Sequence, residues 1–126
     1  MTYATAAAVY RRNAILTASP EKIVQMLYEG AIRHLERSHT ALRDPAMTHS
    51  PEVGESLGKA IGIVGELRSS LDHEAGGELA ANLDRLYEFS LEQISQANLS
   101  RNAEPVENSL RVLRTLKEGW DGIIPN

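Results

Sequence analysis

Four stretches of helical apolar periodicity, separated by short breaks that contain proline or paired glycines, constrain the fold of this chain more than any other feature. The first stretch begins at Ser19-Pro20-Glu21, where serine suits the N-cap, proline the first helical position and glutamate the positive end of the helix dipole. Behind this start, apolar side chains recur every three or four residues, at Ile23, Val24, Leu27, Tyr28, Ala31, Ile32 and Leu35. The pattern predicts a helix that ends before Asp44-Pro45, since the residue before a proline disfavours helix.

The second stretch repeats the same start signal. Ser50-Pro51-Glu52 precedes an apolar stripe that runs from Val53 to Leu71 at helical spacing. A turn is expected at 72–77, because the paired glycines Gly76-Gly77 interrupt regular structure.

The third and fourth stretches complete the pattern. One apolar stripe covers 79–97, a break with a proline follows at 102–105, and the last stripe covers 106–123. Helices of about 20 residues are about 30 Å long, and short connections place consecutive helices antiparallel. The sequence therefore predicts an all-α protein, an antiparallel four-helix bundle formed by the single domain 19–126.

The first 18 residues do not fit that bundle. They carry apolar side chains among alanines and polar residues, at Tyr3, Val9, Tyr10, Ile15 and Leu16. This segment is too apolar for a free tail and too short for a fifth bundle helix. We expect residues 1–18 to form an N-terminal cap segment that packs on the bundle or covers part of its surface.

The amino-acid composition limits which cellular compartment and which classes of partner are expected. The chain has no cysteine, which excludes thiol catalysis and cysteine zinc sites and fits a reducing compartment. Arg11 and Arg12 follow the first apolar residues instead of preceding them, unlike a signal peptide, and no run approaches the ~20 apolar residues of a membrane span. The 13 basic residues are interspersed among 17 acidic ones, for a net charge of −4. We expect a cytoplasmic protein without nucleic-acid binding or membrane insertion.

Motifs for catalysis are weak. The sequence contains no nucleophile elbow and no phosphate-binding loop. A di-metal bundle needs two Glu-x-x-His motifs, and only Glu36-Arg-Ser-His39 is present. His34, between Arg33 and Arg37, is the best candidate for a phosphorelay histidine, which fold analogy alone supports. We therefore expect no enzyme activity, no cofactor and no metal, with a phosphorelay bundle as an alternative.

One helix face carries a row of small residues. Gly58, Gly62, Gly65 and Ser69 share a face of the second predicted helix, beside its apolar stripe. Each glycine costs a helix interior about 1 kcal/mol relative to alanine, so the row calls for a reason. It either lets a partner helix approach closely, or serves close packing within the bundle, or reflects drift.

The residues also carry a family resemblance. The run from Tyr10 to Ile32, with Thr17-Ala-Ser-Pro20 and Met26-Leu-Tyr-Glu-Gly-Ala-Ile32 as its most specific parts, resembles the opening of the FliS family of flagellin export chaperones. The likeness spans nearly the whole chain and continues at Lys59-Ala60, 63–67, 70–72, 76–80, Asn82-Leu83, Leu86-Tyr87, Ala97-Asn98 and Trp120.

The resemblance implies a fold and a function. FliS-like proteins are antiparallel four-helix bundles in the cytoplasm of flagellated bacteria. They bind the disordered C-terminal segment of flagellin, prevent its premature polymerisation and assist its delivery to the export apparatus. In that family the N-terminal residues can occupy part of the client surface when it is empty.

Client contacts are expected at residues that combine the resemblance with an apolar or open position: Tyr10, Asn13, Ile15, Met26, Tyr28, Gly62, Ile63 and Leu91. Tyr28 and Tyr87 carry a polar tip on an apolar body, which predicts half-buried positions at a groove edge. Core positions are expected at Ile23, Leu27, Leu83, Leu110 and Leu113. A chaperone for a different secreted helix remains an alternative, and the same groove could join two copies into a homodimer.

Overall fold

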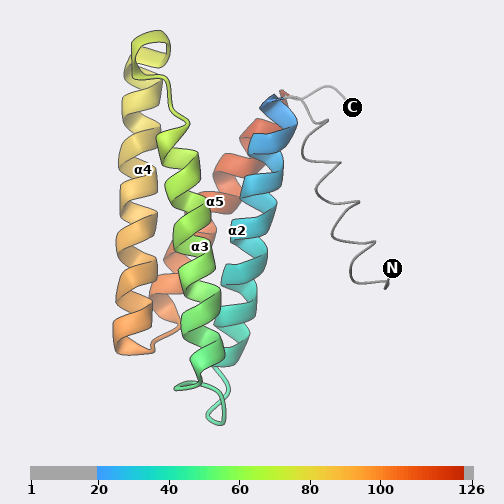
Figure 1. Ribbon diagram of the computed structural model, residues 1–126, viewed down its shortest axis with the longest axis vertical. Helices are drawn as coiled ribbons and strands as arrows, with labels where there is room; N and C mark the ends of the chain where they lie inside the picture. Colours follow the sequence, from blue (N-terminus) through green and yellow to red (C-terminus); the bar gives the residue numbers. More distant parts are fainter. Residues whose placement is uncertain (1–19, 124–126) are drawn as a thin grey trace, which may run out of the picture.

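The computed structural model describes residues 20–123. They form the helices α2 (Pro20–Leu42), α3 (Pro51–Ser69), α4 (His73–Ser100) and α5 (Glu104–Asp121). Consecutive helices run in opposite directions (Figure 1). Each packs against two others, because α2 contacts α3, α3 contacts α4, α4 contacts α5, and α5 returns to α2. The predicted antiparallel four-helix bundle is confirmed, whereas the predicted cap segment 1–18 lies outside the described residues.

Three helices begin where the prolines predict. Pro20 and Pro51 are the first residues of α2 and α3, and Pro105 is the second residue of α5. Ser50 is the N-cap residue of α3, but its side chain makes no capping bond and its buried Oγ has no partner among the described residues. Its carbonyl oxygen instead accepts a hydrogen bond from Nη1 of Arg101 at 2.8 Å.

The connection between α3 and α4 is shorter than expected. A turn was predicted over 72–77, but α3 ends at Ser69 and α4 already begins at His73. The reason is the N-cap Asp72, whose carboxylate accepts a hydrogen bond from the backbone N–H of Ala75 at 3.0 Å. This capping bond starts the helix before the paired glycines.

The paired glycines form a kink within the first turns of α4. Gly77 has φ 52° and ψ −125°, a backbone conformation that side chains with a Cβ rarely adopt. A Cβ at Gly76 would lie 2.8 Å from the Cβ of Ala80, so this position also requires glycine. The glycines thus shape the start of α4 instead of forming the turn itself.

The core runs along the bundle axis. Its largest fully buried hydrophobic side chains are Leu35, Leu57, Leu67, Ile94, Leu113, Val53, Val64 and Val106. Burial of each such side chain contributes about 1.5–3 kcal/mol relative to exposure. Leu110 and Leu113 lie in this core as predicted, whereas Ile23, Leu27 and Leu83 are only partly buried.

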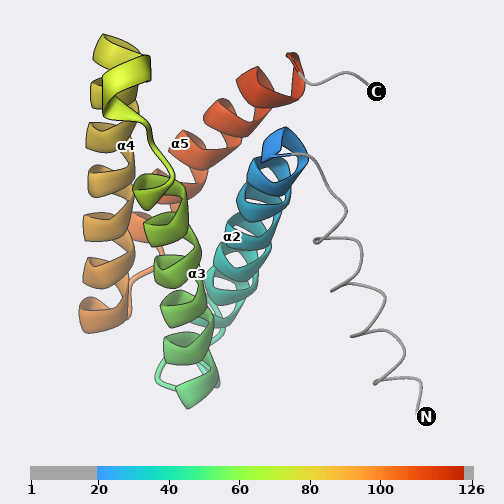
Figure 2. The same cartoon turned by 45° about the horizontal axis from the view of Figure 1, so that its top comes forward.

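The two ends of the bundle differ. At the closed end, formed by the connections 43–50 and 101–103, Arg101 adopts φ 55° and donates hydrogen bonds to the carbonyls of Thr48 at 3.3 Å and Ser50 at 2.8 Å. At the open end, the α3–α4 turn diverges from the start of α2 and the end of α5, as both ribbon views show (Figures 1 and 2).

Candidate protein-binding site

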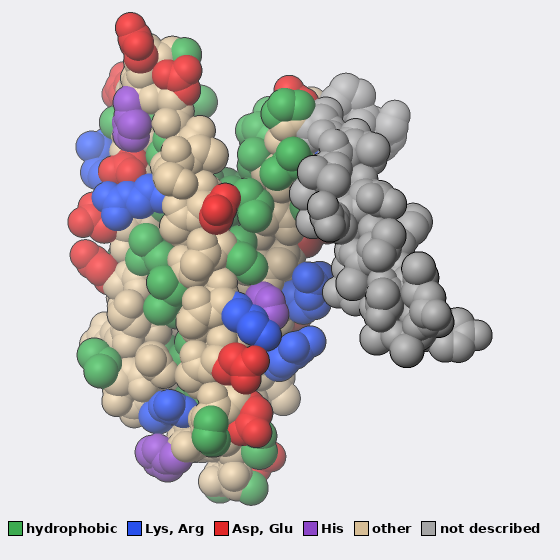
Figure 3. Space-filling model, viewed as in Figure 1, with side chains coloured by type: hydrophobic (Ala, Val, Ile, Leu, Met, Phe, Trp, Pro, Cys, Tyr) green, Lys and Arg blue, Asp and Glu red, His purple; other side chains and the backbone are tan. Residues whose placement is uncertain are grey.

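A cleft of about 590 Å³ occupies the open end of the bundle. Figure 3 shows the molecule hollowed there, between the tip that carries the α3–α4 turn and the limb formed by α2 and α5. We call it the open-end cleft. Its lining is mostly apolar and comes from all four helices and the α3–α4 turn: Val24, Tyr28, Leu67, Ser70, Leu71, Asp72, Ala75, Gly76, Leu79, Ala80, Leu83, Tyr87, Leu116, Gly119, Trp120 and Ile123.

One wall joins the start of α2 to the end of α5. Nε1 of Trp120 donates a hydrogen bond to the carbonyl oxygen of Glu21 at 3.0 Å. Nε2 of Gln25 donates to Oδ1 of Asp121 at 2.7 Å, and Lys117 donates to the other oxygen of that carboxylate at 2.5 Å. The bonds from Lys117 and Gln25 hold the pKa of Asp121 below its ordinary value. The bonds of Trp120 and Gln25 join the end of α5 to the start of α2.

The opposite wall joins the end of α3 to the start of α4. The guanidinium of Arg68 donates two hydrogen bonds to the carboxylate of Asp84, at 2.8 and 3.3 Å. The bond to Arg68 lowers the pKa of Asp84, so the pair stays ionised at neutral pH. Each wall is therefore tied within itself.

The floor is a pair of buried tyrosines that joins the walls. The hydroxyls of Tyr28 and Tyr87 share a hydrogen bond, and their ring centroids lie 6.4 Å apart. They are 3% and 2% exposed, so the prediction of half-buried groove-edge positions was wrong. The amphipathic character of tyrosine is satisfied inside the bundle, because each hydroxyl is the partner of the other. Burial raises both pKa values, and both phenols remain neutral.

The rim of the cleft is apolar and exposed. Leu79 on α4 is 67% exposed, and Ile123 beyond α5 is 71% exposed. Gly119 also lines the cleft, and a Cβ there would meet no atom of the described residues within 4 Å. Exposed apolar side chains around an apolar cleft are typical of a protein-binding surface.

The structure distributes the predicted contact residues over separate surfaces. Tyr28 lies in the cleft floor. Gly62 and Ile63 lie on α3, and Ile63 contacts α2 near Gly30, one turn after Met26. Leu91 lines a shallow groove of about 440 Å³ between α3 and α4. Three further predicted residues, Tyr10, Asn13 and Ile15, lie outside the described residues.

Most residues of the open-end cleft were not predicted from the sequence. Leu79, Trp120 and Ile123 were assigned to apolar stripes, but these stripes do not meet one another at the open end. A signal was present in their position, because all three lie near the ends of predicted helices, where a bundle core tapers.

The row of glycines does not serve packing within the described bundle. A Cβ at Gly58, Gly62 or Gly65 would have no described atom within 4 Å, apart from immediate helix neighbours. Gly30 on α2 is the contrast, because a Cβ there would lie 3.3 Å from Cδ1 of Ile63. Close packing of the described helices therefore explains Gly30 and leaves the row on α3 as open surface.

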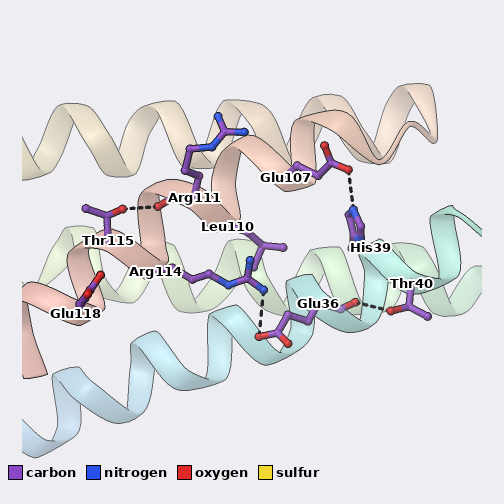
Figure 4. Close-up of a pocket in the computed structure, with 9 residues that line it drawn as sticks. All are labelled: Glu36, His39, Thr40, Glu107, Leu110, Arg111, Arg114, Thr115 and Glu118. Atoms are coloured by element: carbon purple, nitrogen blue, oxygen red, sulfur yellow. Dashed lines mark hydrogen bonds and ion pairs between the residues drawn. The ribbon is translucent and has the colours of Figure 1, made fainter.

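A second groove of about 590 Å³, between α2 and α5, is polar (Figure 4). Nε2 of His39 and Oε1 of Glu107 lie 2.9 Å apart, and Arg114 and Glu36 form an ion pair at 3.6 Å. The hydrogen bond with His39 lowers the pKa of Glu107. Glu36 and His39, the one Glu-x-x-His motif, thus each pair with a side chain of α5. Across residues 20–123, no three His, Asp or Glu side chains gather where they could hold a metal ion.

Comparison with known proteins places this chain in a family. The family model described as "Flagellar protein FliS" matches residues 2–126. The flagellar secretion chaperone FliSB of Pseudomonas aeruginosa is 42% identical over 106 residues, which cover 84% of this chain and 82% of that protein. The flagellar secretion chaperone FliS of Vibrio cholerae is 44% identical over 108 residues, 86% of this chain and 77% of that protein. The namesake in Salmonella typhimurium is 36% identical over 114 residues, 90% of this chain and 82% of that protein.

The family model covers the four helices and extends beyond them on both sides. The matched relatives are named as chaperones, and none of them as an enzyme. The bundle with its apolar cleft, the resemblance of the first helix and the family match agree: the chain belongs to the FliS family of flagellar secretion chaperones.

Proposed function

We propose that this protein is a flagellar secretion chaperone that binds the disordered C-terminal segment of flagellin in the open-end cleft. The observation that carries the proposal is the cleft itself, an apolar cavity of about 590 Å³ with exposed apolar residues on its rim. Ordering a disordered client costs about 2–5 kcal/mol, and a preformed apolar surface offsets that cost. The ion pairs and hydrogen bonds within each wall keep the surface in place before the client arrives.

The consequence of this binding is control over assembly. A flagellin whose C-terminal segment is occupied cannot use that segment to polymerise, and it can be handed to the export apparatus as a complex. We propose that this takes place in the cytoplasm. Among the described helices, none is both long and apolar enough to cross a bilayer.

Residues 1–18 are the proposed cover of the empty cleft. They lead into Pro20, which begins α2 at the open end. They carry Arg11 and Arg12 and no acidic residue, whereas Asp72, Glu74 and Glu78 give that end negative charge. Apolar residues of the segment would take the place of the client.

A paired substitution tests the cover. Tyr10→Ala combined with Ile15→Ala is expected to tighten client binding several-fold, because a competitor for the cleft is weakened. Weaker binding of the client would instead show that Tyr10 and Ile15 contact the client directly.

Calorimetric titration with the C-terminal segment of flagellin from the same bacterium tests the proposal as a whole. We expect tight binding with a strongly negative heat-capacity change, which marks burial of apolar surface. Gly119→Leu places a side chain in the cleft and should weaken binding about tenfold or more, which corresponds to ~1.4 kcal/mol. Gly119→Ala is the matched control, since it changes helix propensity in the same direction without filling the cleft.

Three results would contradict the proposal. Unchanged binding by Gly119→Leu would exclude the cleft as the site. Absence of flagellin binding, together with binding of a helix from another exported protein, would identify a different client. A stable homodimer in ultracentrifugation that flagellin does not dissociate would show that the cleft joins two copies of the chain.

A further inference from the structure

Positive charge is concentrated on the face shared by α2 and α3. Arg33, Arg37 and Lys59 surround His34, and Figure 3 shows Lys and Arg side chains gathered around a histidine over these two helices. Lys59 forms an ion pair with Glu55 at 3.2 Å, whereas Arg33 and Arg37 have no ion-pair partner within residues 20–123. Three cations therefore gather around His34, on a chain whose net charge is −4.

These cations act on the histidine between them. The Nδ1 atom of His34 is buried and finds no hydrogen-bond partner among the described residues. Burial lowers the pKa of His34 first, and the positive charges of Lys59, Arg33 and Arg37 lower it further. The histidine is therefore neutral at physiological pH, and the guanidinium and ammonium groups carry the charge of this face.

An open strip of small residues runs beside the cations. Gly58 and Gly62 lie next to Lys59 and Ile63 on α3, and the space above both glycines is empty of described atoms. Met26 shares a face of α2 with Gly30, which approaches Ile63. Small residues beside apolar ones allow the backbone of a partner helix to approach closely. We call this surface, made of Met26, Gly30, Arg33, Arg37, Lys59, Gly58, Gly62 and Ile63, the basic α2–α3 face.

Charge decides which occupant fits. The chain's own residues 1–19 contain Arg11 and Arg12 and no acidic residue, so the basic α2–α3 face repels them. A second copy of the same face would be repelled for the same reason. A nucleic acid would need a wider basic surface than three cations. A protein helix with acidic residues along one flank matches both the charge and the open strip of small residues.

We propose that the basic α2–α3 face binds an acidic amphipathic helix of the export client, next to the segment held in the open-end cleft. The inference rests on the proposed chaperone function and adds a specificity rule to it. The apolar edge of the client helix lies on Met26, Ile63 and the glycines, and its Asp and Glu residues face Arg33, Arg37 and Lys59. Continuity is provided by α2, because Val24 and Tyr28 line the cleft and Met26 and Gly30 belong to the neighbouring face.

Two synthetic peptides of about 18 residues, long enough to form a helix, test the charge rule directly. They share one apolar face of leucine and alanine, and carry either glutamate or lysine on the flank. Titration of the full-length protein should show binding of the acidic peptide and at least about tenfold weaker binding of the basic one. Raising the salt concentration from about 0.05 to 0.5 M should weaken binding of the acidic peptide only, because salt screens the attraction between exposed charges.

Charge reversal locates the site. Arg33→Glu combined with Arg37→Glu should weaken binding of the acidic peptide about tenfold and strengthen binding of the basic peptide. Arg43→Glu combined with Arg111→Glu is the matched control, because it changes the net charge equally but near Glu107 on the α2–α5 side. Gly62→Leu should abolish peptide binding without loss of the fold, since no described atom occupies the space it enters.

The outcomes separate this inference from the chaperone proposal. If the flagellin segment binds and Gly119→Leu weakens it, while charge reversal at Arg33 and Arg37 changes neither flagellin nor peptide binding, the basic face is wrong and the cleft stands. If the acidic peptide discriminates as described but no flagellin segment binds, the charge rule stands and the client is wrong. Equal binding of both peptides, or displacement of the acidic peptide by a short single-stranded oligonucleotide, would overturn the inference.

Discussion

The two ends of this bundle are built from the same kind of amphipathic helix but differ in how completely their apolar side chains are buried. At the closed end, apolar residues such as Val53, Ala97 and Val106 are fully buried. At the open end, Leu79 on α4 and Ile123 beyond the end of α5 remain largely exposed, although the sequence pattern assigns both to apolar stripes. Amphipathic periodicity therefore does not by itself seal a core, and the ends of the stripes can remain available for a partner.

Polar bonds explain how the difference is maintained. At the closed end they connect opposite sides of the bundle, since Arg101 of the α4–α5 connection binds the α2–α3 connection. At the open end the bonds of Trp120 and Gln25 join α5 to α2, and those of Arg68 join α3 to α4. Among the described residues at the open end, the hydrogen bond between Tyr28 and Tyr87 is the one that links the α2–α5 pair to the α3–α4 pair. Each wall is thus linked within itself, and the space between the walls stays open.

The largest difference between the two ends is expected in the free energy of unfolding when a leucine is replaced by alanine. Leu57→Ala, at a fully buried position of α3 toward the closed end, should lower the free energy of unfolding by about 3 kcal/mol. Leu79→Ala removes the same atoms from an exposed position and should change it by less than about 0.5 kcal/mol. Urea denaturation measures both. A comparable loss at Leu79 would mean that the open end is packed in solution.

The tyrosine floor should give the next largest effect. Tyr28→Phe leaves the buried hydroxyl of Tyr87 without a partner and should cost about 1–3 kcal/mol. Tyr28→Phe combined with Tyr87→Phe should cost less than the sum of the two single changes, because no orphaned hydroxyl is left. Additive losses in this double-mutant cycle would show that the hydroxyls do not interact.

The same pair predicts an alkaline limit to stability. Both folded pKa values are raised, so the stabilising contribution is complete below the ordinary tyrosine pKa of 10.0. Above that pH the unfolded chain loses phenolic protons that the folded chain keeps, and stability falls as pH rises. The double phenylalanine variant should lack this part of the alkaline decline.

The architecture could be predicted from local signals. Proline at the start of α2, α3 and α5 and apolar periodicity between these starts are properties of short segments, and they gave the four helices and their order. The boundary at the α3–α4 turn was misplaced, because the paired glycines were given more weight than Asp72, a favoured N-cap residue. A kinked helix start and a turn share the same glycine signal.

The candidate site was harder to predict for a physical reason. Whether Tyr28 lies at a surface or in a core depends on Tyr87, which is 59 residues away and becomes its neighbour only in the folded bundle. Whether Leu79 and Trp120 line a cleft or lie in a core also depends on how the helices diverge at the open end, which the sequence of one helix does not determine. Periodicity identifies which side of a helix is apolar and does not identify what covers it.

The same negative charge, placed at one end of α4 or at the other, tests where the client binds. Leu79→Glu, on the rim of the open-end cleft, should weaken binding of the flagellin C-terminal segment about tenfold, or ~1.4 kcal/mol, because a carboxylate loses solvation against an apolar client. Leu99→Glu is the matched control, since Leu99 is also on α4 and even more exposed, at 87%, but lies toward the closed end. Equal losses in calorimetry would place the client along the whole of α4 and not in the cleft.

The smallest expected effect belongs to the ion pair between His39 and Glu107, which ties the last turn of α2 to the first turn of α5 near the closed end. The folded pKa of Glu107 is depressed, so its stabilising contribution is present above the ordinary glutamate pKa of 4.5 and is lost as pH falls through the folded value. Both side chains are partly exposed, and exposed pairs contribute little. Glu107→Gln should therefore leave stability nearly unchanged at a pH well below the folded pKa of Glu107 and lower it slightly at pH 6. Chemical denaturation across this range measures the difference between variant and wild type. A constant difference at all pH values would show that the contact acts through packing and not through charge.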